Sequence, residues 1–244
     1  MTSASVDRLV CKFDHPAPSQ QPGRELEALR QLQRLLQSVH GVEASAVERF
    51  LVTAEEKSRL APGQGDDEAL FLRGSLELGE LDLGLFLSDE VLAQLGRPQR
   101  DPWSLPRLRG FCAATEGVSH FLYLCHRAEA RRPVSMLELE AQAELDKYLC
   151  VLLQLWATGR RAASAELRRR LFGTLSFRSG LTRQEGERYR LASALAAAAA
   201  RVLEARFVVS GRLEALLREV RRLYRLGGGE KLSAFASGQL AWAA

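Results

Sequence analysis

"EGVSHFLYLCHRAEARRPVSMLELEAQAELDKYL", residues 116–149, is the stretch that decides the fold of the second half of the chain. Apolar side chains recur at helical spacing on both sides of a short turn, ARRPV at residues 130–134. Ser135 and Glu138 match the S-x-x-E capping box, which marks where the second helix begins. Because a turn of this length joins antiparallel neighbours, the stretch predicts a helical hairpin. Its expected core faces are Leu108, Phe111, Val118, Leu122 and Cys125 on the first helix, and Leu137, Ala141, Leu145, Tyr148, Leu149, Leu152 and Trp156 on the second.

The polar side chains of this hairpin also fall into stripes. The stripe opposite the apolar face of the first helix consists of Arg109, Glu116, His120, Tyr123 and Arg127. Folding near residues 132–133 would place residue 144 opposite about residue 121 and residue 147 opposite about residue 118. We therefore expect Glu144 to meet His120 and Lys147 to meet Glu116.

Two kinds of functional site are compatible with these stripes. Glu116 and His120 are four residues apart, as are Glu140 and Glu144, so the four side chains could supply ligands to one divalent metal ion. Such an ion would polarise a phosphate or activate water, as in a metal-dependent hydrolase or nuclease. Without a metal, His120 oriented by Glu144 would act as a general base, with Lys147 as a third candidate catalytic residue. No cofactor is predicted apart from this metal.

A structural interpretation of the same residues is simpler, and we favour it. The charged side chains would pair across the hairpin at its surface and fix the register of the two helices, each pair contributing about 0–1 kcal/mol. The pattern has no second histidine at ligand spacing, and it departs from the Glu-x-x-His arrangement of di-iron bundles.

The chain after residue 106 is expected to be helical throughout. Glycine, proline or capping residues separate the predicted helices, as in a helical bundle. The alanine-rich run LASALAAAAARVLEA (191–205) predicts a tightly packed helix face, since alanine forms helices well and allows close approach. The predicted helices cover residues 105–130, 135–158, 162–172, 183–206, 209–226 and 230–241.

The first 96 residues are expected to form a small α+β domain. Residues 69–87 alternate leucine with small or charged residues on both sides of Gly79 and Glu80, which predicts a β-hairpin with a two-residue turn. The helix at 23–39 is expected to cover this hairpin, and Ser88 to cap a short helix. Strands are predicted at 8–13 and 46–53, and a loop at 55–68. A proline-rich linker at 97–106 would then lead to a helical bundle domain at 107–244.

Charge is distributed unevenly along the chain. The net charge is +4, and residues 151–244 carry 17 basic and 7 acidic side chains, whereas residues 1–100 carry 11 and 16. The basic C-terminal half favours an acidic protein partner, with nucleic acid as a possible alternative. Only four of the 34 basic residues are lysine, and alanine is abundant, which is typical of a GC-rich bacterial genome. Part of the arginine content would then reflect codon usage.

The densest basic tract covers residues 159–190, with phenylalanine and tyrosine interspersed. Arginine for phosphates and aromatic rings for base stacking are what sequence-tolerant nucleic-acid binding needs. No helix-turn-helix, RRM or KH signature accompanies them, so a solvated helical face is the favoured interpretation. The candidate binding residues are Arg160, Arg161, Arg168, Arg169, Arg170, Arg178, Arg183, Arg188 and Arg190.

Location and function follow from these patterns as expectations. No apolar run of about 18 residues exists and the N-terminus carries charges, so we expect a cytoplasmic protein without a membrane partner. The four cysteines show no CxxC pair, which favours buried thiols in a reducing compartment. We expect a non-enzymatic intracellular bacterial interaction or regulatory protein that docks onto an acidic partner or nucleic acid. The alternative is the metal-dependent hydrolase or nuclease.

Overall fold

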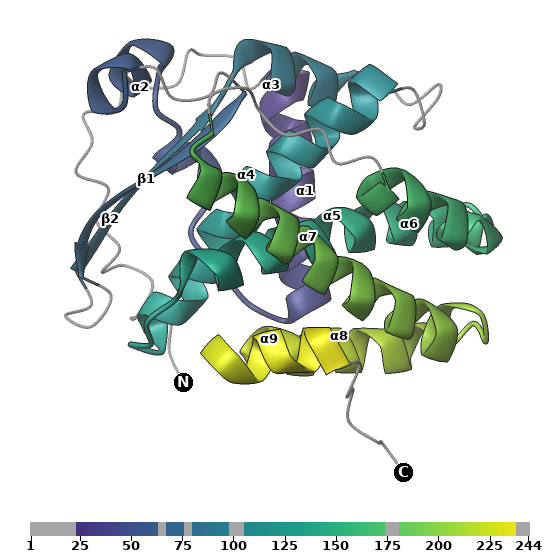
Figure 1. The fold of residues 1–244 in the computed structure, drawn as a ribbon. Coiled ribbons are helices and arrows are strands. Elements are labelled where there is room, and N and C mark those ends of the chain that lie inside the picture. Colours follow the sequence, from purple (N-terminus) through teal and green to yellow (C-terminus); the bar gives the residue numbers. More distant parts are fainter. Residues whose placement is uncertain (1–22, 63–66, 76–79, 98–104, 174–180, 238–244) are drawn as a thin grey trace. The chain divides into compact units, whose positions relative to one another are not determined.

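The computed structural model of the chain describes residues 23–62, 67–75, 80–97, 105–173 and 181–237. Helices dominate these residues, and two strands form one antiparallel hairpin (Figure 1). The predicted fold class, a small α+β part followed by a larger helical part, is therefore confirmed. The chain divides into two compact units, residues 1–38 with 42–133, and residues 39–41 with 134–244.

The division between the units falls at Pro133 and Val134. The predicted linker at 97–106 lies largely outside the described residues. Helix α4 (Leu105–Glu129) packs against both strands and against α3 (Asp89–Gly96). Because of these contacts, α4 belongs with the N-terminal elements of the first unit, whereas the sequence placed it in the bundle domain at 107–244.

The first unit begins with α1 (Arg24–His40), which confirms the helix predicted at 23–39. The strand predicted at 46–53 is wrong, since Val47–Phe50 form a 3₁₀ turn, η2, and only Leu51 makes an isolated bridge, to Leu85. The Gln33 side chain holds this segment by donating to the Ser45 carbonyl at 2.8 Å and accepting from the Val47 amide at 2.9 Å. These bonds engage the backbone groups that a strand would use for pairing.

A short helix, α2 (Ala54–Leu60), occupies part of the loop predicted at 55–68. Thr53 and Glu56 form a complete capping box, because each side chain bonds the backbone amide of the other residue. The predicted loop is wrong here, and the T-x-x-E signal at Thr53 was the sequence feature that indicated a helix start.

The predicted β-hairpin is confirmed as β1 (Glu68–Ser75) and β2 (Glu80–Leu87). Its turn differs from the prediction, since Glu80 pairs with Ser75 inside the ladder and the connection is residues 76–79, which lie outside the described residues. Leu83, Leu85 and Leu87 alternate along β2 and are all buried. Ser88 caps α3 as predicted, its hydroxyl accepting from the Val91 amide.

The helix that packs across both strands is α4 rather than the predicted α1. Gly117 makes the close approach possible. A Cβ added at Gly117 would lie 2.8 Å from Leu85 Cδ1 and 3.1 Å from Glu68 Cγ. The absence of a side chain at this position therefore brings the α4 backbone onto the hairpin.

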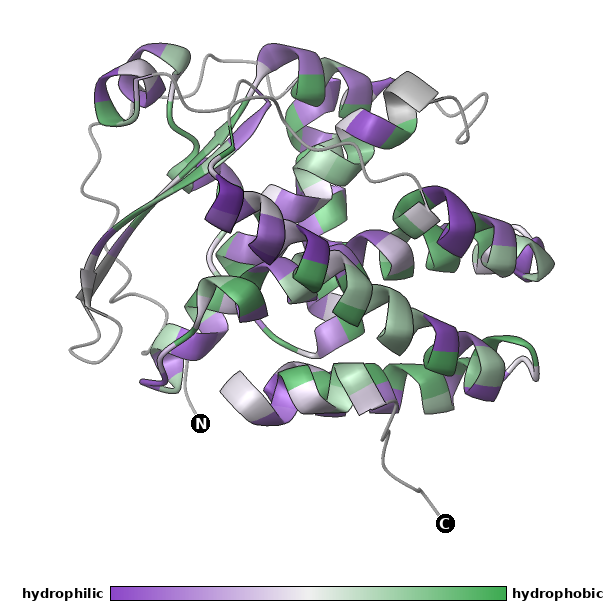
Figure 2. Ribbon diagram, in the orientation of Figure 1, coloured by the Kyte–Doolittle hydropathy of each residue, from purple (hydrophilic) through white to green (hydrophobic). Residues whose placement is uncertain are grey.

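The described part of the second unit is helical. It contains α5 (Met136–Ala157), the 3₁₀ turn η3 (Arg161–Ala163), α6 (Ser164–Gly173), α7 (Arg183–Leu203), the π-helical turn η4 (Glu204–Val208), α8 (Leu213–Arg225) and α9 (Gly228–Ser237). The helices predicted for this region are confirmed to within a few residues at their described ends, whereas the predicted end of the last one, at residues 238–241, lies outside the described residues. Helix α7 begins hydrophilic and becomes hydrophobic along its alanine-rich half (Figure 2). The alanines of that half pack against α5 and are fully buried at Ala192, Ala196, Ala199 and Ala200.

We expect Gly117→Val to destabilise the chain by about 1–3 kcal/mol, because the added methyl groups overlap Leu85 in a packed core. Urea unfolding followed by circular dichroism measures the change. The matched control is Gly173→Val at the last position of α6, where an added Cβ meets no atom within 4 Å. Equal unfolding midpoints for the two variants would contradict the close approach of α4 to the hairpin.

Candidate functional site

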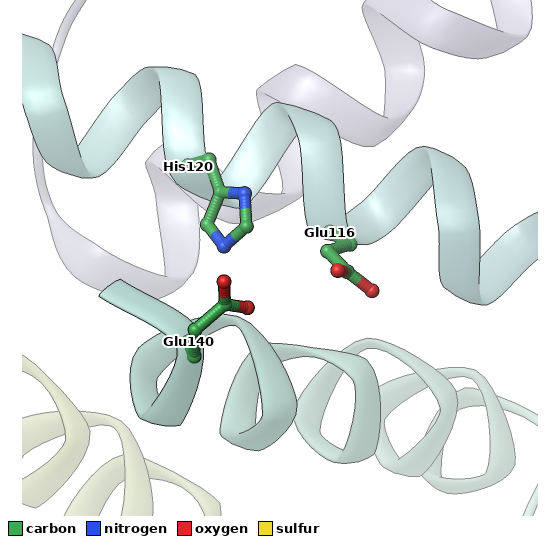
Figure 3. Close-up of side chains that lie close together, drawn as sticks. All are labelled: Glu116, His120 and Glu140. Atoms are coloured by element: carbon green, nitrogen blue, oxygen red, sulfur yellow. The ribbon is translucent and has the colours of Figure 1, made fainter. Parts of the chain in front are cut away.

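Helix α4 carries the first half of the Glu/His cluster. Glu116 and His120 lie one turn apart on α4, and a carboxylate oxygen of Glu116 and a ring nitrogen of His120 lie within 4.8 Å of each other (Figure 3). His120 Nδ1 lies 3.8 Å from a carboxylate oxygen of Glu68 on β1. His120 is only 5% exposed. A histidine between two carboxylates is well placed to bind a cation or to hold a proton.

The other predicted site residues, Glu140, Glu144 and Lys147, lie on helix α5, in the second unit. Glu140 is 4% exposed, and the Lys147 ammonium donates to the Glu144 carboxylate at 2.6 Å along the same helix. The metal and catalytic roles of these residues stay predictions. The expectation of a surface charge face is wrong for His120 and Glu140, because both side chains are buried. A buried carboxylate must be compensated by hydrogen bonds or by an opposite charge. Losing a partner of a buried side chain therefore costs more stability than losing one member of a surface ion pair.

A buried polar chain in the second unit was not predicted. Lys231 on α9 donates to the Gln142 side-chain oxygen at 2.9 Å, and the Gln142 amide nitrogen donates to Asp146 at 2.9 Å. Asp146 also bonds His40 Nε2 at 2.9 Å. The His40 ring stacks on Tyr224 with centroids 3.9 Å apart, and the Lys231 ammonium lies 5.2 Å from the centre of the Tyr224 ring. All five side chains are buried.

The hydrogen-bond donors and acceptors of these buried side chains can be assigned in only one consistent way. An ammonium only donates and a carboxylate only accepts, so Gln142 must turn its oxygen to Lys231 and its nitrogen to Asp146. The same carboxylate requires the proton on His40 Nε2. His40 Nδ1 is buried and finds no hydrogen-bond partner among the described residues.

A pocket of about 730 Å³ lies within the second unit, beside η4. Its buried carboxylate, Glu204, accepts from the Ser164 hydroxyl at 2.5 Å and from Arg168 Nε at 2.9 Å. Arg161 and Arg201 also line the pocket, and among the described residues neither guanidinium forms a hydrogen bond or an ion pair. Three guanidinium groups and one carboxylate leave the pocket with a positive charge. Its remaining lining is small or aliphatic, namely Gly159, Ala162, Ala165, Ala205, Val208 and Val209.

Most arginines of the basic tract are paired with acidic residues or rings. Glu166 pairs with both Arg169 and Arg170, and the hydrogen bond from Arg170 lowers the pKa of Glu166. Arg183 pairs with Glu187. Arg188 lies over the Tyr189 ring, and Arg168 is bound by Glu204. Arg160 and Arg190 are exposed, and Arg178 lies outside the described residues. Because most of these arginines already have partners within the chain, fewer of them are available to a ligand than the composition of the tract suggests.

Comparisons with known proteins leave these residues as the only basis for a function. No family model, curated protein or solved structure matches the chain. Among the described residues, no helix has both the length and the apolar character needed to cross a bilayer.

We expect Asp146→Ala to cost about 3–5 kcal/mol, because it leaves His40 and Gln142 without their buried acceptor. The control is Gln154→Ala, at a half-buried position on the same helix, for which we expect less than about 0.5 kcal/mol. Thermal and urea unfolding of both variants provide the measurement. A stability equal to wild type for Asp146→Ala would show that the chain of hydrogen bonds contributes nothing.

Proposed function

We propose that the chain is a non-enzymatic interaction or regulatory protein, working inside a bacterial cell, whose basic helical C-terminal region docks onto an acidic protein partner. The observation that carries this proposal is the pair of guanidinium groups, Arg161 and Arg201, that line an open pocket without an acidic partner among the described residues. A ligand can bind cations of this kind without first breaking an ion pair within the protein, so none of its binding free energy is lost to that step.

An acidic protein is favoured over nucleic acid as the partner. Arg169, Arg170 and Arg183 already pair with glutamates, which reduces the number of phosphates that the basic tract would neutralise. Its two aromatic rings among the described residues are also engaged, since Phe172 contacts the Tyr148 ring and Tyr189 contacts Arg188. Base stacking needs exposed ring faces, so these contacts weigh against a single-strand binding surface.

Binding is favoured over turnover because the nucleophilic groups near the pocket are not poised to react. The Ser164 hydroxyl is buried and committed to Glu204, and that carboxylate is in turn bound by Arg168. The Tyr148 hydroxyl, which is not part of the pocket lining, is buried, and burial raises its pKa, which disfavours the reactive phenolate further. A general base would need a free lone pair near the reacting proton.

A second candidate function is the metal-dependent hydrolase or nuclease. Its support is the approach of Glu116 to the buried His120 on α4. The candidate requires carboxylates from α5, Glu140 or Glu144, to join these two residues, because two ligands do not hold a divalent ion firmly.

The docking proposal predicts salt-sensitive binding of the full chain to labelled poly-glutamate. We expect the dissociation constant to rise at least about tenfold when the salt concentration goes from about 50 to about 200 mM, since the attraction is between charges. Fluorescence anisotropy measures it, with a neutral poly-serine peptide as the control. No binding of poly-glutamate at low salt, or tighter binding of single-stranded DNA, would contradict docking onto an acidic protein.

The metal candidate predicts that the purified chain binds about one divalent ion, and that Glu116→Gln weakens binding about 10–100-fold. The control is Glu129→Gln at an exposed position near the end of α4. Elemental analysis and titration with zinc and manganese test it. A wild-type chain that binds neither metal would remove the candidate.

A further inference from the structure

We infer that the pocket beside η4 is the docking point for the partner, and that it takes a carboxylate side chain flanked by aliphatic residues in an acidic segment of that protein. This inference rests on the proposed function and adds the site and the chemistry that it recognises. The residues come from three consecutive parts of the second unit, namely η3 with α6, the end of α7, and η4.

Arg161 is held in place while its donor groups stay available. Its guanidinium lies over the Trp156 ring at 5.8 Å. It also lies close to the Gly211 backbone, where an added Cβ would come within 3.3 Å of Arg161 Nη2. Gly211 has a φ of 71°, a conformation that glycine adopts without strain. A cation restrained by an aromatic ring loses little conformational entropy on binding, so it favours a ligand at this position.

Arg201 supplies the second positive charge from the last turn of α7. It is exposed, and it lies three residues before Glu204. Glu204 does not neutralise it, because that carboxylate is occupied by Ser164 and Arg168. The pocket thus offers two cations to an incoming anion, with a third, Arg168, fixed against the buried carboxylate.

The π-helical turn places apolar groups beside these charges. In η4 the Val209 amide donates to the Glu204 carbonyl five residues earlier, at 3.1 Å. Val208, the last residue of this turn, is buried, whereas Val209, which follows it, is 73% exposed at the pocket. An exposed valine next to unpaired cations provides a contact for an aliphatic side chain of the ligand.

These features favour a carboxylate with an apolar neighbour over a phosphate backbone. A nucleic-acid backbone presents a row of phosphates and gains most from an extended row of cations. Here the unpaired cations are gathered in one pocket of about 730 Å³, a volume within the range of ligand sites and large enough for one or two partner side chains. The aliphatic lining would remain unused against phosphate.

The experiment is fluorescence anisotropy of the full chain with a labelled peptide in which glutamate alternates with leucine. We expect Arg201→Gln and Arg161→Gln each to weaken binding about tenfold, since each removes a charge-assisted hydrogen bond. The control is Arg183→Gln, outside the pocket, whose side chain is 93% exposed and paired with Glu187. We expect that change to stay within about twofold, as for surface ion pairs. Replacing the leucines of the peptide by serine should weaken binding to the wild-type chain.

The outcomes separate the inference from the proposed function. Equal losses in Arg201→Gln and Arg183→Gln would overturn the pocket as the docking point, while docking onto an acidic partner would stand. Equal affinity for the leucine and serine peptides would overturn the aliphatic requirement. Binding of DNA or of a free dicarboxylate that matches the leucine peptide and depends on Arg201 would replace the acidic segment with that ligand. A wild-type chain that binds none of the peptides would overturn both.

Discussion

The buried ammonium of Lys231 is the constraint on which the second unit depends. A charge that is fully removed from water must be met by acceptors, and Lys231 finds one in Gln142. Through Gln142 and Asp146 the chain of bonds reaches His40, which lies 106 residues from Asp146 in the sequence. This explains why the end of α1 groups with the later helices. Two arginines of α8 also hold the end of α1. Arg221 donates to the Val39 carbonyl, and Arg225 donates to the carbonyls of His40 and Gly41.

The helices could be predicted from the sequence because their signals are local. Apolar periodicity and capping residues such as Ser88 and Ser135 act within one or two turns, and the structure has helices beginning at both. The buried polar chain could not be predicted, since its bonds join residues 89 and 106 positions apart. The stripe on α4 was recognised as polar, but periodicity does not reveal whether a polar stripe is exposed, and His120 is buried.

Lysine usage is a sequence signal that could have drawn attention to one member of the buried polar chain, although not to its partners. Arginine makes up 30 of the 34 basic residues, and lysine differs from it in carrying a compact ammonium on a flexible chain. Of the four lysines, Lys231 and Lys57 are buried and Lys147 is half-buried, whereas Lys12 lies outside the described residues. Lys57 lies 5.6 Å from the centre of the Phe86 ring, a contact that a compact ammonium makes well. Counting lysines rather than total basic residues would therefore have pointed to Lys231.

The charge of the pocket results from the way α7 ends. Helix α7 packs against α5, and its alanines are fully buried as far as Ala200. One extra residue in the π-helical turn rotates the residues after the turn by about 100° relative to a regular helix. Glu204 itself stands at the start of this turn, where its carboxylate accepts from Ser164 and Arg168 of α6, which leaves Arg201, one turn earlier, without that carboxylate as a partner. Val209, directly after this turn, is 73% exposed and lines the same pocket, so an apolar side chain and an arginine without an acidic partner among the described residues lie side by side there.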